Sequence, residues 1–115
     1  MTDNFLKKLK DYGVDTEKTF NRFMGNTDMY ISFLKQFPED PNFSLIGPAL
    51  EKGDFDAALI ATHTVKGVAA NLGLDPLANA CAQTVRLIRE GKIEEAGKSF
   101  PDIERAYAEA MKLID

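Results

Sequence analysis

The sequence predicts an all-α protein on three observations. Apolar residues recur with the 3.6-residue period of an α-helix along almost all of the 115 residues. No segment shows the alternating, β-branched pattern of a strand. Glycine, proline and capping residues divide the chain into helical lengths joined by short connections. Because short connections make long amphipathic helices antiparallel neighbours, we expect an up-down bundle of four helices, with short N-terminal helices packed at one end.

Two short helices are expected at the N-terminus. The first covers residues 3–11 and stops at Gly13, since glycine readily takes the left-handed conformation that ends a helix. Asp15 is placed to cap the second, which we expect to continue to about residue 24.

A third helix is expected to begin with Thr27 as its cap and to end before Pro38. Residues 38–41 then form a kink or a loop, and helix resumes over residues 43–52. The apolar face of the third helix holds Met29 or Tyr30, Phe33, Leu34 and Phe37.

The next helix is the most regular, with Asp54 as its cap and Gly73 at its end. Thr62 is the one polar residue on its inner face, where its hydroxyl group can bond a carbonyl of the preceding turn. That face holds Phe55, Ala58, Leu59, Thr62, Val65, Ala69 and Leu72.

Two further helices complete the chain. Asp75 is expected to cap the first, with Pro76 at its first helical position and Gly91 at its end. Pro101 predicts a kink or a restart within the second. Their inner faces hold Leu77, Cys81, Thr84 and Ile88 in the first, and Ile93, Ala96, Phe100, Ile103, Tyr107 and Ala110 or Met111 in the second.

The composition narrows the class of protein. A formal net charge of −4 with acidic and basic residues interspersed gives no reason to expect nucleic-acid binding. One cysteine and one histidine exclude an internal disulfide and a Cys/His zinc cluster, and Cys81 reads as a small buried hydrophobic residue. No apolar run suggests a membrane span and no signal peptide is evident. We therefore expect one domain over residues 1–115, monomeric and cytoplasmic.

The only histidine, His63, is followed by Lys66 and Gly67. Residues three and four apart share one face of a helix, and Ala70 falls on the same flank, away from the inner face. A neutral imidazole is a nucleophile, an ammonium group neutralises a phosphoryl group, and a glycine leaves room for another protein. This combination is typical of a site that passes a phosphoryl group between proteins.

Each of these three residues also has an ordinary interpretation. A lone histidine on a helix is usually a surface residue, and a surface lysine usually a solvated charge. A glycine in the middle of a helix costs about 1 kcal/mol relative to alanine, so Gly67 indicates close approach, either by a partner or by another part of this chain.

The run from His63 to Gly73 closely resembles the core motif of histidine-containing phosphotransfer (HPt) domains. The resemblance implies a helical bundle whose histidine accepts a phosphoryl group from a receiver-domain aspartate and gives it to another, without hydrolysing ATP. It extends over nearly the whole chain, through Gly13–Asp15, Phe20–Phe23, Tyr30, Leu34–Phe37, Leu50–Phe55 and Arg89–Gly91.

Carried over to this sequence, the resemblance makes His63 the phosphoacceptor, Lys66 the phosphate-stabilising cation and Gly67 the small residue that admits the partner. It implies receiver domains of response regulators and a sensor histidine kinase as partners, with Mg²⁺ on the receiver and no cofactor in this chain. The docking patch would comprise Ile60, Thr64, Gly67 and Ala70, together with parts of the first helix such as Phe5 or Leu9.

One position departs from the family pattern. Family members often have a glutamate or glutamine that can hydrogen-bond the imidazole, where this chain has Val85. Since the hairpin turn near residue 74 puts position 85 roughly opposite His63, the ring must be oriented by water, by Gln83 or Arg86, or by nothing.

Two other functions stay open at this point. The chain would serve equally as a helical adaptor that binds receiver or kinase domains without being phosphorylated, although an adaptor need not keep His63 or Lys66. It would also fit the phosphotransfer domain of a chemotaxis-type histidine kinase, phosphorylated directly by a kinase domain.

Overall fold

The computed structural model describes residues 1–114, which form seven α-helices, one short 3-10 helix and no strand. The all-α prediction is therefore confirmed. The elements are α1 (Asp3–Tyr12), α2 (Thr16–Arg22), α3 (Thr27–Gln36), η1 (Phe37–Glu39), α4 (Asn42–Lys52), α5 (Phe55–Asn71), α6 (Asp75–Arg89) and α7 (Ile93–Ile114).

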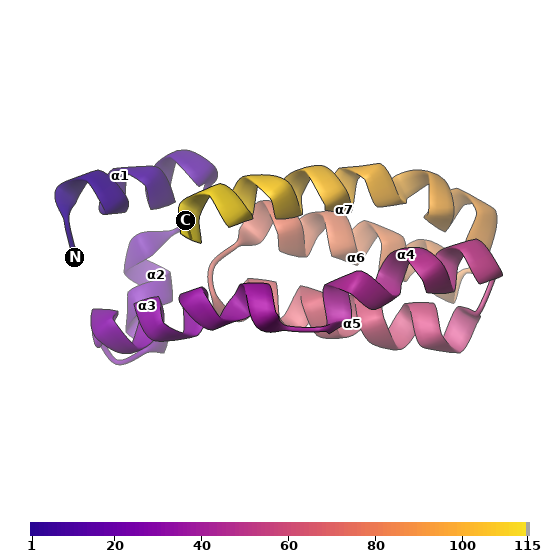
Figure 1. The fold of residues 1–115 in the computed structure, drawn as a ribbon, viewed down its shortest axis with the longest axis horizontal. Coiled ribbons are helices and arrows are strands. Elements are labelled where there is room, and N and C mark those ends of the chain that lie inside the picture. The colour runs from indigo at the N-terminus through magenta and orange to yellow at the C-terminus, as the bar shows by residue number, and fades with distance from the viewer. Residues whose placement is uncertain (115) are drawn as a thin grey trace.

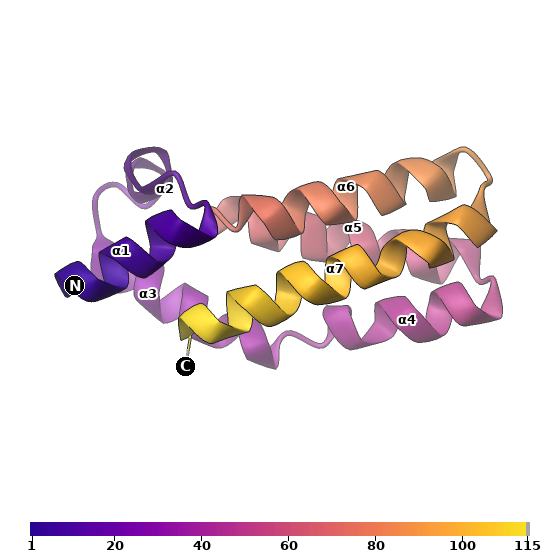
Figure 2. The ribbon, with the colours of Figure 1, turned by 90° about the horizontal axis from the view of Figure 1, so that it is seen from above.

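The molecule is elongated, with extents of 43 × 22 × 22 Å. Helix α5 packs between α4 and α6, and α7 packs against α6 and α4, so these four helices close a ring. They alternate in direction along the long axis, whereas α1, α2 and α3 gather at one end, where the turn between α5 and α6 also lies (Figure 1, Figure 2). This arrangement leaves one side of α5 uncovered by any helix in the described part of the chain.

Gly73, in the turn between α5 and α6, has a φ of +74°, in the left-handed region that glycine tolerates best. A Cβ atom at this position would lie 3.0 Å from Val14 Cγ1 and 3.1 Å from Thr19 Cγ2. The N-terminal helices therefore pack directly on this turn, and only glycine leaves enough space there.

Several helix ends differ from the prediction. Asn26, rather than Thr27, caps α3, because its side-chain oxygen accepts a hydrogen bond from the Met29 amide at 3.0 Å. Helix α6 has no side-chain cap, and Asp75 lies inside its first turn, where a carboxylate favours the positive end of the helix dipole.

Two other boundaries also differ. Helix α2 ends at Arg22, because the chain turns at Met24 with a φ of +56°. Pro101 neither ends nor restarts the last helix, which is continuous from Ile93 to Ile114.

Two aromatic residues predicted to face the core are largely exposed. Phe33 is 47% exposed, although its ring packs against Phe23 with a centroid distance of 5.9 Å. Phe55 is 42% exposed and is the first residue of α5. Helical periodicity predicts which side of a helix faces inward but does not show how far the neighbouring helices extend over it.

Thr62 and Thr84 are fully buried on α5 and α6 but differ in hydrogen bonding. The Thr62 hydroxyl has no partner within residues 1–114, so the predicted bond to the preceding turn is wrong. The Thr84 hydroxyl shares a hydrogen bond of 2.6 Å with the Ser99 hydroxyl.

We expect Thr62→Val to raise the free energy of unfolding by about 1 kcal/mol, because valine has nearly the same shape and removes a buried, unpaired hydroxyl. Thr84→Val is the matched control and should lower it by about the same amount, since it breaks an existing hydrogen bond. Urea unfolding followed by circular dichroism measures both. A loss of stability in Thr62→Val would show that the hydroxyl is satisfied in solution.

Candidate functional site

Helix α5 carries the predicted site, and small residues determine how it packs. Its buried face consists mainly of alanines, with one threonine and one valine, so α4 and α6 can approach closely on either side. The buried residues are Ala58, Ala61, Thr62, Val65 and Ala69. The opposite face of α5 remains open to solvent.

Both ends of α5 are fixed by side chains. The Asp54 carboxylate accepts a hydrogen bond from the Ala57 amide at 3.1 Å at the N-terminus. At the other end, the Arg22 guanidinium donates to the carbonyl oxygens of Ala70 at 3.0 Å and Asn71 at 2.8 Å. The carbonyl groups of the last helical turn lack partners within the helix, and Arg22 supplies one to Asn71 and a further one to Ala70, which also accepts from the Gly73 amide.

Tyr30 adds a buried hydrogen bond just beyond α5, because its hydroxyl donates to the Leu72 carbonyl at 2.8 Å. The rings of Phe20 and Phe23 pack edge-on against Tyr30, each with a centroid distance of 5.4 Å. Burial raises the pKa of Tyr30 to about 12, with the Arg22 charge acting in the opposite direction, so the hydroxyl keeps its proton at neutral pH. The sequence analysis missed this role of Arg22 and Tyr30, and no local pattern signals it.

His63 lies on the open face of α5 and is exposed, as expected from its position off the inner face. No side-chain hydrogen bond or ion pair within residues 1–114 involves its ring. The imidazole is therefore accessible to a partner, and no protein group fixes its orientation.

Lys66, one turn further along α5, is half-buried. Burial raises the pKa of the Cys81 thiol on α6 to about 12, and the positive charge of Lys66 acts in the opposite direction. Among the described residues no carboxylate pairs with Lys66. Its charge is thus available to a group that binds beside His63.

Gly67 is exposed, and a Cβ atom added there would meet no other atom within 4 Å. The hypothesis that this glycine serves internal packing is therefore wrong. The open space above it lies on the same face of α5 as His63.

The predicted docking residues divide into two groups. Ile60, Thr64 and Ala70 are exposed on α5, and Ile60 is 66% exposed. Leu9 cannot belong to a docking surface, because it is 0% exposed and lies in the core. Phe5 lines a separate cleft with Leu113 and Ile114 of α7, so the contribution expected from the first helix is wrong for Leu9 and unsupported for Phe5.

Val85 is only 2% exposed, so its side chain lies in the protein interior rather than beside an exposed ring. Gln83 and Arg86 also leave the imidazole free, because the Arg86 guanidinium donates to the Gln83 side-chain oxygen at 2.9 Å. Neither Gln83 nor Arg86 therefore orients the His63 ring.

Together, the open face of α5 offers an unrestrained nucleophile, an unpaired cation one turn away and an empty space beside both. Within residues 1–114, no carboxylate forms a hydrogen bond or ion pair with His63, so no side chain is placed to act as its general base. Such a face suits a group that attacks without losing a proton first, and it suits a reaction completed by a second protein.

In a comparison with known families, residues 28–112 match the model of the Hpt domain. The comparisons with curated proteins and with solved structures find no match. No helix of residues 1–114 has the length and apolar character needed to cross a membrane. Hpt domains are phosphocarriers rather than enzymes, and they interact with receiver domains and histidine kinases in two-component signalling. Since the match spans well over half of the sequence, the chain belongs to the Hpt domain family.

Proposed function

We propose that this chain is a phosphorelay intermediate, in which His63 accepts a phosphoryl group from the aspartate of one receiver domain and passes it to the aspartate of a response regulator. The observation that carries the proposal is the position of His63, which is exposed with Gly67 on the face of α5 that no helix covers and has the half-buried Lys66 one turn away. The family match supports it. We also interpret the ring of α4–α7 as the up-down four-helix bundle expected from the sequence, because its helices alternate in direction.

The proposed transfer requires little from this chain beyond the placement of the His63 imidazole. The lone pair of Nε2 attacks phosphorus in line, an N–P bond forms, and the P–O bond to the donor aspartate breaks with its electrons going to the carboxylate. The neutral imidazole keeps its proton on Nδ1 throughout, so no general base is required. The reverse sequence delivers the phosphoryl group to the next aspartate.

Lys66 would stabilise the negative charge of the phosphoryl group on His63, because it lies one turn away without a carboxylate partner. The receiver domain would supply its own carboxylates and Mg²⁺, and this chain would bind no cofactor. Docking must be weak enough for donor and recipient to exchange, which corresponds to a total interface of about 1,200 Å² or less. We expect the chain to act as a monomer in the cytoplasm.

Neither alternative function has an observation that favours it. A non-phosphorylated adaptor has no need for an exposed imidazole with a free cation beside it. Direct phosphorylation by a kinase domain would use the same His63 and differs only in the donor.

His63→Gln should abolish phosphoryl acceptance and leave the fold intact, because an amide fills similar space at an exposed position but lacks the nucleophile. Incubation with an aspartyl-phosphorylated receiver domain, followed by a test for acid-labile, base-stable phosphate, measures the change. Circular dichroism provides the control for folding. Label retained by the variant would refute the proposed mechanism, since the chain has no other histidine.

Lys66→Ala should slow transfer by about tenfold and barely change stability. Lys66 forms no ion pair within residues 1–114, and even a surface ion pair contributes only about 0–1 kcal/mol to folding, whereas a phosphoryl dianion in a drier, docked interface interacts more strongly with a cation. Rapid-quench measurements of transfer at several salt concentrations test this. Equal rates for both proteins at every concentration would remove Lys66 from the mechanism.

Gly67→Gln should have opposite effects on stability and transfer. Replacing an unconstrained glycine inside a helix with a good helix former should raise the free energy of unfolding by about 0.5–1 kcal/mol. The long side chain would occupy the open space beside His63, so receiver-dependent transfer should slow, whereas labelling by phosphoramidate should continue.

Gly97→Gln is the matched control, because Gly97 lies inside α7 and a Cβ atom there also meets no atom within 4 Å. It should gain similar stability without slowing transfer. If Gly67→Gln transfers at the wild-type rate, the partner docks elsewhere.

A further inference from the structure

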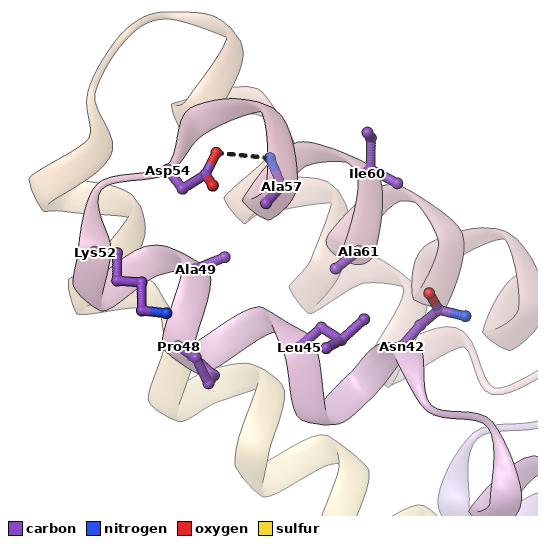
Figure 3. Close-up of a pocket in the computed structure, with 9 residues that line it drawn as sticks. All are labelled: Asn42, Leu45, Pro48, Ala49, Lys52, Asp54, Ala57, Ile60 and Ala61. Carbon is purple, nitrogen blue, oxygen red and sulfur yellow. Dashed lines mark hydrogen bonds between the residues drawn. The ribbon is translucent and has the colours of Figure 1, made fainter.

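An apolar groove of about 400 Å³ lies between α4 and α5 (Figure 3). Leu45 and Ile60 form its walls and are 54% and 66% exposed. Space remains between the walls because the residues there, Ala49, Ala57 and Ala61, have small side chains. Two large apolar side chains that remain in water beside a groove indicate a surface that another molecule covers.

The groove is continuous with the face that carries His63. Ile60 precedes His63 by three residues, so the two side chains share a face of α5, about 4.5 Å apart along the helix axis. A weak interface of about 1,200 Å² buries about 600 Å² on each partner, which equals a disc with a radius of about 14 Å. A protein that reaches His63 with such an interface therefore also covers Ile60 and the near part of the groove.

The charged rim of the groove limits what fits it. Asp54 lies at its far end, where the carboxylate is already engaged in capping α5. Lys52 lies at the same end, and no acidic group within residues 1–114 forms an ion pair with it. An apolar side chain followed by a carboxylate is the complementary group.

We propose that the α4–α5 groove is a selective docking site for the receiver domain, and that it binds an apolar side chain of the receiver flanked by an acidic residue that pairs with Lys52. This inference rests on the proposed function, because the receiver is the partner that must reach His63. The groove then determines which receivers bind, whereas His63 and Lys66 act on any phosphoryl group presented to them.

The test compares Leu45→Gln and Ile60→Gln with the wild-type chain, since glutamine retains length and helix propensity but removes the apolar surface. The control is Met24→Gln, which alters an 88% exposed apolar side chain in the turn between α2 and α3. Each protein receives phosphate from the receiver domain that transfers fastest to the wild type, and separately from phosphoramidate. The measured quantities are the receiver concentration at half-maximal rate and the rate of phosphoramidate labelling.

Each groove variant should raise the half-maximal receiver concentration about five- to tenfold, whereas Met24→Gln should leave it unchanged. Labelling by phosphoramidate should be equal in all four proteins. Lys52→Glu should raise the half-maximal concentration about threefold at low salt, and this difference should shrink as salt is added.

The outcomes separate this inference from the proposed function. If the wild type accepts phosphate from receivers and both groove variants match it within twofold, the groove inference is wrong and the proposed function stands. If phosphoramidate labels the wild type but no receiver does, both fail. If light scattering shows a wild-type dimer that Ile60→Gln dissociates without affecting transfer, the groove binds a second copy of the chain and the receiver assignment is overturned.

Discussion

The packing of α5 between α4 and α6 through small residues is the constraint on which the rest of the structure depends. Because Ala58, Ala61 and Ala69 bring both neighbours close, α5 is buried along one face over its whole length while the other face stays open. Larger residues on the inner face would push the neighbouring helices away, and a fifth helix on the outer face would cover His63. Ala61 also lines the groove between α4 and α5, together with Ala49 and Ala57.

The sequence predicted the helices well, because the 3.6-residue period and the punctuation by glycine and proline are local signals. The predictions were wrong where tertiary contacts determine the end of a helix or the burial of a side chain. The cap of α3 moved by one residue to Asn26, since adjacent residues of the same chemical kind compete for the same amide groups. The exposure of Phe33 and Phe55 depends on how far neighbouring helices extend, which no single helix encodes.

The candidate site shows the same division. His63, Lys66 and Gly67 were predicted to lie together because three residues within two turns of a helix have a fixed geometry. The hydrogen bonds from Arg22 and Tyr30 to the end of α5 join positions more than forty residues apart, and the sequence around either residue does not predict them. The docking expectation for Leu9 was wrong for the same reason, since a helix can be placed near a site only after its packing is known.

Helix α5 is fixed at both ends but carries an imidazole that no side chain restrains, and this has a consequence for the proposed transfer. The bonds from Asp54 and Arg22 hold the backbone beneath His63, but no side chain within residues 1–114 fixes its ring. In the proposed transfer, the docked partner would therefore supply the final alignment of Nε2 with phosphorus, and the free energy of binding would offset the cost of that alignment. An exposed Gly67 also costs about 1 kcal/mol of helix stability with no internal contact in return. Both features make sense if contacts away from the imidazole, such as those at Ile60, position the partner.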